Sequence, residues 1–428
     1  MTTETPTTEP ADEASTDETP ATVTPTGETP AGRWIPCEED ASGHSFGSEE
    51  LAAVTEVLTS GRLLSDSGGF VGRLEEAFAA RYGAAGAVAC SSATSGIQAA
   101  LVALGLPRGA EVITTPLTDI GGVAPIVAAG LVPVFADVDP VTGNLDPASV
   151  EAAVGPRTEA IVVTHLVGKP CDMTALAAIA ERHRLLIVED CAQAYDARHA
   201  GVPVGTFGAI ACYSTQQTKH ISAGEGGLML VNDPGLIAPV RSWINKGVEG
   251  GVRSRTEDHP IVGANARMTE LQAAVLCAQL DKLTGFVTAR ITRARELSAA
   301  LADIPALTTP SSGVGEVQTY WKYLLSVDPH RLPGVRERLD AELDARRAVV
   351  QPCYLHLPLF TKSLFDRHAV RLVGESAAAT GRRPATAEGF DGMRGFTDRA
   401  VVLWWNERIG AADVARIADL VHTVVAKG

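Results

Sequence analysis

The stretch "AIACYSTQQTKHISAGEGG" (residues 209–227) places a single cation, Lys219, between an apolar run and a glycine-rich turn. The run 209–213 has the length and composition of a buried strand. A lysine beyond such a strand is usually solvated through its long stem. A lysine amine removed from water can also attack a carbonyl group and form a Schiff base. The stretch allows both interpretations, so the rest of the chain must decide between them.

Short apolar runs on both sides of this stretch predict the fold class. Seven of them are predicted as strands: 86–90, 111–115, 132–138, 160–166, 185–190, 209–213 and 227–232. Helical patterns lie between several of these runs, at 95–105, 120–130 and 173–184. Nearly continuous apolar strands are buried on both faces, and their alternation with helices indicates a mainly parallel α/β sheet. Ligands of such sheets bind beyond the carboxyl ends of the strands.

The chain is expected to divide into three parts. Residues 1–40 are rich in Thr, Pro and Glu and are predicted as a disordered acidic tail. Residues 41–304 form a large domain that ends in long helix over 266–304, and residues 305–428 form a smaller C-terminal α/β domain. The elements predicted in that smaller domain are a strand at 321–327 and helices at 335–347 and 412–425.

Composition and charge exclude several classes of protein. The net charge is −15, and residues 1–40 contribute ten acids and one base to it, so the remaining body carries only −6. That balance gives no sign of nucleic-acid binding. No apolar run is long enough to span a membrane, and no signal or transit pattern is present, so we expect a cytoplasmic protein. The seven cysteines are scattered without a CxxC pair, which favours free thiols over disulfides or zinc.

The turn after the first strand, "CSSATSG" (90–96), could bind an anion. The backbone N–H groups of Ala93, Thr94 and Ser95 would stand at a helix N-terminus, where phosphate is commonly bound. An ordinary capped helix, with Ser92 or Thr94 as the cap, explains the same residues.

Two further strand ends carry groups that fit together with this turn. Asp190 ends the run 185–190, where an acid can cap a turn or face the protonated nitrogen of a pyridine ring. Gln193 could reach the same ring, Ser214 could reach a phosphate, and Lys219 would supply an amine. A phosphate nest, an acid and a lysine at neighbouring strand ends together predict a pyridoxal phosphate site.

The segments that carry these residues resemble the keto-sugar aminotransferases of the DegT family, which are fold type I pyridoxal phosphate enzymes. The resemblance covers about residues 45–425 and rests on "SSATSGIQAALVALGL", "VFADVDPVTGNLDPASVEAAVGPRTEAIVVTHLVGKPCDM", "VEDCAQAYDARHAGVPVGTFGAIACYSTQQTKHISAGEGGLMLVND" and "GANARMTELQAAVLCAQL". It implies transfer of an amino group from glutamate or glutamine to a nucleotide-linked keto-sugar or a keto-cyclitol. Antibiotic or other secondary-metabolite and amino-sugar biosynthesis is the setting it implies.

The resemblance also implies roles for individual residues. Lys219 matches the lysine that binds the cofactor as a Schiff base, Asp190 the partner of the pyridine nitrogen, and Gln193 the group beside the ring hydroxyl. The residues that match phosphate ligands are Ala93, Thr94 and Ser214.

Two further segments match parts of the family that lie around the site. Asn265 and Arg267 match a segment that reaches the phosphate region of the neighbouring subunit, which implies a homodimer with shared active sites. Tyr354 and His356 resemble a substrate-side segment, although packing or surface polarity explains them equally well.

The sequence departs from the family pattern at two places. Asp119 follows Thr118 where the family often has an aromatic residue that stacks on the ring, so the stacking group is left open. The pair 216–217 is Gln-Gln where a Tyr-Pro is common, and this version is similar to aminotransferases that act on keto-cyclitols. Relatives with histidine at the lysine position dehydrate sugars instead. Here the flanking stretches "STQQTK" and "GEGG" align Lys219, and not the adjacent His220, with that position, which argues against a dehydratase.

Two alternatives of other classes remain. One is a non-catalytic regulator that binds the cofactor on the same scaffold. The other is a nicotinamide-dependent oxidoreductase, which would need a GxGxxG turn where the chain has "CSSATSG".

Overall fold

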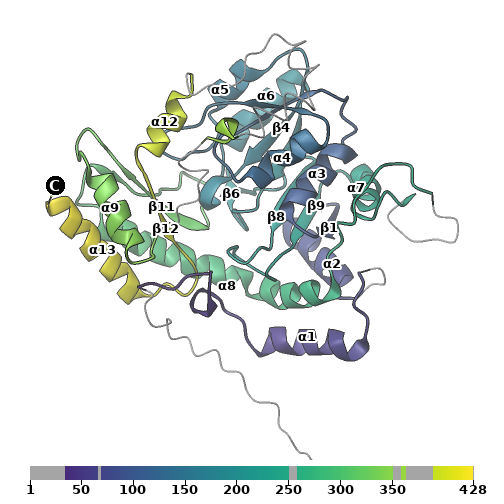
Figure 1. Ribbon diagram of the computed structural model, residues 1–428, viewed down its shortest axis with the longest axis horizontal. Helices are drawn as coiled ribbons and strands as arrows, with labels where there is room; N and C mark the ends of the chain where they lie inside the picture. Colours follow the sequence, from purple (N-terminus) through teal and green to yellow (C-terminus); the bar gives the residue numbers. More distant parts are fainter. Residues whose placement is uncertain (1–33, 66–68, 250–257, 350–357, 363–388, 428) are drawn as a thin grey trace, which may run out of the picture.

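The computed structural model describes residues 34–65, 69–249, 258–349, 358–362 and 389–427 (Figure 1). Its centre is a seven-stranded sheet in the order β1-β9-β8-β5-β4-β2-β3. The strands are β1 (Gly86–Cys90), β2 (Glu111–Thr114), β3 (Val132–Phe135), β4 (Thr158–Thr164), β5 (Leu186–Asp190), β8 (Ile210–Ser214) and β9 (Gly227–Val231). All neighbouring pairs are parallel except those that β9 makes with β1 and β8. The predicted mainly parallel α/β sheet is therefore confirmed, and all seven predicted runs lie in it.

Helices cover both faces of this sheet. One face packs on α3 (Ala93–Ala103), α4 (Ala124–Ala128) and α7 (Ile237–Ile244). The other face packs on α2 (Phe70–Tyr82), α5 (Pro147–Ala153), α6 (Met173–His183) and α8 (Glu270–Ala300). Because alternate residues of each strand enter the cores on opposite faces, the strands are apolar throughout.

The long helix α8 connects the two ends of the molecule. Figure 1 shows it running from α1 (Ser48–Ser60) and α2 to the C-terminal helices. It begins at Glu270 and not at residue 266, because the Thr269 side chain accepts the N–H of Gln272 and caps the first turn. Among the described residues, no helix combines the length and the apolar character needed to cross a bilayer.

The C-terminal part of the chain contains a second sheet, which is antiparallel. It has the order β10 (Leu307–Thr308), β11 (Lys322–Val327) and β12 (Ala400–Trp404), with α9 (Val335–Asp344) and α13 (Ala411–Ala426) packed against it. Strand β12 was missed by the sequence analysis. The remaining elements are the hairpin β6 (Arg198–His199) and β7 (Val202–Pro203), helix α12 (Asp391–Thr397) and the 3₁₀ turns η1 (Ala41–Gly43), η2 (Ile120–Gly122), η3 (Leu166–Gly168), η4 (Pro234–Leu236) and η7 (Leu359–Thr361). A domain boundary near residues 304 and 305 stays our proposal.

The predicted boundary of the disordered tail, at residue 40, lies too far along the chain, because residues 34–40 pack against the C-terminal part. Ile35, Cys37 and Glu38 are buried, and the Asn406 side chain donates a hydrogen bond to the Pro36 carbonyl oxygen. The apolar Trp-Ile pair at 34–35 was a sequence signal for this packing.

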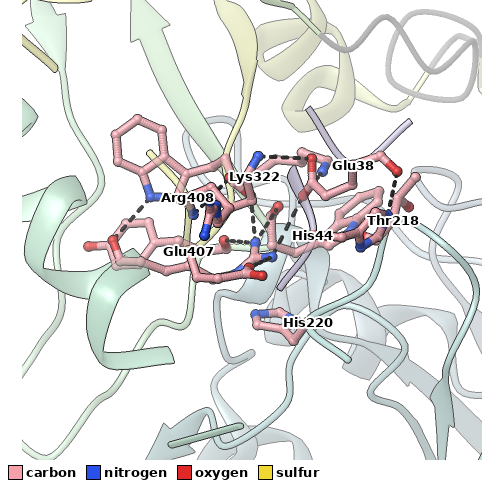
Figure 2. A network of polar contacts seen from close by, with 12 residues as sticks. Glu38, His44, Thr218, His220, Lys322, Glu407 and Arg408 are labelled. Carbon is pink, nitrogen blue, oxygen red and sulfur yellow. Dashed lines mark hydrogen bonds and ion pairs between the residues drawn. The ribbon is translucent and has the colours of Figure 1, made fainter. Parts of the chain in front are cut away.

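Glu38 pairs with the buried Lys322 (Figure 2) and lies near a second buried cation, Arg290, which also pairs with Glu407. Its carboxylate lies 2.9 Å from Lys322 Nζ and 3.6 Å from an Arg290 guanidinium nitrogen. All three side chains are almost fully excluded from solvent. A buried charge without a partner is costly, so Glu38 ties the N-terminal segment to β11 and α8.

We expect the Glu38→Gln variant to lose about 3–5 kcal/mol of unfolding free energy, since it leaves Lys322 without its carboxylate. Denaturant unfolding of the variant and the parent protein measures the loss. Glu39→Gln is the control, because Glu39 is exposed and should change stability by no more than ~0.5 kcal/mol. Equal effects of the two substitutions would show that the buried network contributes nothing.

Candidate active site

A cavity of about 420 Å³ lies at the carboxyl ends of the central strands. Its lining comes from the turn after β1, the segment around η2, the residues after β5 and β8, and the C-terminal sheet. The lining residues are Ser92, Ala93, Thr94, Ile97, Thr118, Asp119, Gly121, Gly122, Asp190, Ala192, Gln193, Ser214, Gln216, Thr218, Lys219, Glu225, Trp321 and Trp404. The volume is within the range of small-molecule sites. Six predicted site residues therefore meet around one space.

A second cavity of about 390 Å³ lies on another part of the surface. Asp139, Asn144, Lys169 and His199 are among its lining residues, and none of the predicted site residues lines it.

The N-terminus of α3 presents free donors to the first cavity. Ser92 is the cap, and its hydroxyl oxygen accepts the N–H of Ser95. In the described part of the chain, the N–H groups of Ala93 and Thr94 have no protein acceptor. Two unpaired N–H groups at a helix N-terminus are suited to an anion such as phosphate.

Gly227 allows β9 to pass close to this turn. A Cβ at Gly227 would lie 2.5 Å from the carbonyl carbon of Ser92 and 2.6 Å from the nitrogen of Ala93. No other residue fits there without displacing the turn at Ser92 and Ala93.

Asp190 ends β5 with its carboxylate at the cavity. It is 5% exposed, and its Oδ1 accepts the N–H of Ala192 at 3.1 Å. Thr164 donates to its Oδ2 at 3.4 Å. Burial raises the pKa of this carboxyl, and the N–H of Ala192 and the charge of Lys219 partly offset that rise. A cation placed against Asp190 would keep it ionised.

The residue before Asp190 holds the neighbouring loop from the opposite side of the strand. The Glu189 carboxylate accepts backbone N–H groups of Gly205, Phe207 and Gly208 at 2.7 to 2.9 Å, and His165 contacts it at 3.2 Å. This buried network fixes the end of β5, and with it the direction of Asp190.

Gln193 is also held in a single orientation. Its Oε1 accepts the N–H of Val167 at 2.7 Å, and Val167 has a left-handed backbone with φ of 50°. Since the oxygen is engaged, the amide nitrogen is the end that can donate to a ligand.

Lys219 lies in the connection between the antiparallel strands β8 and β9, which keeps it at the same edge of the sheet. Its backbone N–H donates to the Gln216 carbonyl oxygen at 3.0 Å. Its Nζ lies 4.0 Å from the centroid of the Trp321 ring. Burial, followed by repulsion from Lys322, lowers the pKa of the amine to about 8. The free amine is therefore available near neutral pH.

Trp321 is an aromatic group at the cavity that the sequence analysis did not assign to the site. It lies in the C-terminal part of the chain, and its Nε1–H donates to the Thr218 carbonyl oxygen at 2.6 Å. Asp119, at the position where an aromatic residue was considered, instead caps η2 by accepting the N–H of Gly121. A Cβ at Gly122 would lie 3.1 Å from Asp190 Oδ2, so this segment packs closely over the acid.

Asn265 and Arg267 do not line the cavity of their own chain. Asn265 forms a backbone bridge with Asn245, and Arg267 donates to the Asn245 side-chain oxygen. Tyr354 and His356 lie outside the described residues.

The donor set fits pyridoxal phosphate. The cavity offers unpaired N–H groups for a phosphate, a buried carboxylate for a ring nitrogen and a lysine amine for an aldehyde. These three groups stand on separate elements, as a molecule with an anion, a basic nitrogen and an aldehyde at different positions requires.

Solved structures share this architecture. The chain matches the aminotransferase from Psychrobacter cryohalolentis with a TM-score of 0.81 and 28% identity, over 90% of this chain and 98% of that one. It matches a 3-amino-5-hydroxybenzoic acid synthase with a TM-score of 0.77 and 26% identity, over the same shares. Fold and site together define a fold type I pyridoxal phosphate-dependent transferase.

Sequence comparisons assign the chain to one family within this class of transferases. A model of the DegT/DnrJ/EryC1/StrS aminotransferase family matches residues 44–381, and the chain belongs to that family. It is 38% identical over 337 residues to the L-glutamine:2-deoxy-scyllo-inosose aminotransferase of Streptomyces kanamyceticus, covering 74% of this chain and 77% of that relative. It is 36% identical over 300 residues to the GDP-perosamine synthase of Caulobacter vibrioides, covering 69% and 80%. The predicted aminotransferase class is thus confirmed.

Proposed function

We propose that the protein transfers the amino group of L-glutamine to a keto-cyclitol, with pyridoxal phosphate as cofactor. The observation that carries amino transfer is that Lys219 and Asp190 face one cavity beside a free helix N-terminus. The acceptor and donor are inferred from the relatives, several of which are L-glutamine:2-deoxy-scyllo-inosose aminotransferases. The Gln-Gln pair at 216–217 supports the same acceptor class.

The cofactor would be held by groups on four elements. Ala93, Thr94 and Ser214 would bind its phosphate, Asp190 its ring nitrogen and Gln193 its ring hydroxyl. When bound, pyridoxal phosphate supplies an electron sink that stabilises negative charge at the α-carbon of the amino acid. Asp190 supports this because an ionised carboxylate keeps the ring nitrogen protonated.

Lys219 would attach the cofactor and then act as the base. With a substrate amine in its place, the free Nζ would remove the proton from the donor's α-carbon and pass it on to the cofactor side. The lowered pKa of about 8 leaves a useful fraction of the amine unprotonated at neutral pH, and that fraction increases as the pH rises. In the second half-reaction Nζ would move a proton in the opposite direction, taking it up from the cofactor side and delivering it to the acceptor carbon.

A homodimer with shared sites belongs to the same proposal. Asn265 and Arg267 would reach the phosphate region of the second subunit. Leu51, Leu58 and Leu63 are large apolar side chains that are 51%, 60% and 49% exposed, as expected of a surface that a second copy covers. We also propose a cytoplasmic location, and Tyr354 and His356 as residues on the acceptor side.

The test follows each half-reaction separately. We expect the visible absorbance of bound pyridoxal phosphate to fall when L-glutamine is added, with one equivalent of 2-oxo acid formed per site. Adding 2-deoxy-scyllo-inosose should then restore the absorbance, as ping-pong transfer requires. A GDP-linked keto-sugar is the comparison acceptor and should give the lower kcat/KM.

Different failures would have different meanings. If no amino acid changes the absorbance, the protein binds the cofactor without turnover, as a regulator would. If glutamine reacts and only the nucleotide-linked sugar restores the absorbance, amino transfer stands and the keto-cyclitol assignment is wrong.

A further inference from the structure

A second lysine shares the aromatic ring that Lys219 contacts. Lys322 Nζ lies 4.8 Å from the centroid of Trp321 and 4.3 Å from that of Trp404. Lys219 Nζ lies 4.0 Å from the centroid of the same Trp321 ring. The separation of the two nitrogen atoms therefore cannot exceed the sum of their two distances to that centroid. Two cations are therefore close together in a region with little water, where like charges repel strongly.

Lys322 is fixed in place by the N-terminal segment. The Glu38 carboxylate lies 2.9 Å from Lys322 Nζ, and both side chains are buried (Figure 2). The backbone of Glu38 also contacts the loop that carries Lys219, because Gln217 Nε2 donates to the Glu38 carbonyl oxygen at 3.0 Å. The segment, the second lysine and the Lys219 loop thus form one connected unit.

We propose that Lys322 is a positioning residue for Lys219: held over Trp321 by Glu38, its positive charge disfavours the ammonium form of Lys219. The proposal rests on the proposed role of Lys219. Its effect is to keep the Lys219 amine free to attack the aldehyde of the cofactor and to accept a proton. Lys322 touches no reacting atom in this scheme and acts through charge alone.

The other charged groups around Lys219 oppose this effect. Asp190, Asp119 and Glu38 all favour the ammonium form, whereas Lys322 is the largest influence on its pKa after burial. Burial lowers the pKa of Lys322 itself and Arg290 on α8 adds to that shift, whereas Glu38 opposes it and holds Lys322 in the charged form. Since Lys322 is the strongest of the charges that act on Lys219, removing it should have a measurable effect.

The test titrates Lys219 in the protein without cofactor. The rate at which a small acylating reagent labels Lys219, measured by mass spectrometry against pH, gives the midpoint at which its amine loses the proton. The parent protein should show a midpoint of about 8. Lys322→Met should raise it by about one pH unit, and Lys322→Arg, which keeps the charge, should leave it near the parent value. An unchanged midpoint in Lys322→Met would overturn the proposal.

Two variants guard against a purely structural explanation. Glu407→Gln alters the same network, since Glu407 lies 3.1 Å from Arg290, but it leaves Lys322 and Trp321 untouched. It should not move the midpoint, and a shift as large as that of Lys322→Met would overturn the proposal.

The second variant, Glu38→Gln/Lys322→Met, replaces the buried ion pair by neutral groups, an exchange that proteins often tolerate. It should still raise the midpoint, but by less than Lys322→Met, because the loss of Glu38 removes a weaker charge that favours the ammonium form; it provides the test if Lys322→Met does not fold. A midpoint equal to that of the parent protein would again contradict the role of Lys322. Because this labelling uses no cofactor and no turnover, its failure is distinguishable from failure of the proposed amino transfer.

Discussion

Lys219→Ala should lower kcat for amino transfer by at least ~10⁴-fold, because the variant loses both the covalent attachment of the cofactor and the general base. The fold should survive the change. Among the described residues, the Lys219 side chain forms no hydrogen bond or ion pair, and its contact with the Trp321 ring contributes only about 0.5–2 kcal/mol. Steady-state kinetics and a thermal unfolding curve, taken on the same preparation, measure the two effects.

Lys169→Ala is the control for Lys219→Ala. It removes a lysine that pairs with Glu316 at the second cavity, so activity should stay close to that of the parent protein. Adding a small primary amine to Lys219→Ala should restore part of the lost rate, since the amine can replace the missing base. Near-normal turnover of Lys219→Ala without added amine would exclude the proposed mechanism.

The sequence was a good guide to the site wherever a residue follows an apolar strand. Asp190, Ser214 and Lys219 stand at the ends of β5 and β8, and the period and length of those runs determine where the strands end. Thr94 joins them because a Ser-rich turn after β1 predicts a helix start. These short-range signals were sufficient to predict that the acid, the amine and the turn after β1 lie at one cavity, and their roles toward a cofactor stay predictions.

Trp321, Lys322 and Glu38 carried no comparable signal. Trp321 and Lys322 follow Lys219 by about a hundred residues and appeared only as the beginning of a strand. Glu38 was one acid among ten in a segment whose composition predicts disorder. Their role depends on how the N-terminal segment and β11 pack beside the β8–β9 connection, and that tertiary contact has no local pattern.

Asp190→Asn should lower kcat by about 10²–10³-fold, the usual cost of removing one preorganised electrostatic partner. The amide occupies nearly the same volume and can still accept the N–H of Ala192, so cofactor binding and stability should change little. Without a carboxylate the ring nitrogen loses its proton, and the cofactor becomes a poorer electron sink. Single-turnover rates with L-glutamine would locate the loss in proton removal from the α-carbon.

The pH dependence gives the second readout for Asp190. Burial raises the pKa of its carboxyl in the protein without cofactor, so in the parent protein cofactor binding, and with it the rate at limiting cofactor, should fall on the acidic side as Asp190 becomes protonated. Asn has no such titration, so the acidic fall due to this group should be absent in the variant. Asp196→Asn is the matched control, since Asp196 pairs with Arg81 outside the cavity and should leave both the rate and its pH profile unchanged. A parent-like rate in Asp190→Asn would mean that the ring nitrogen is held by another group, and the assignment of this carboxylate would have to be withdrawn.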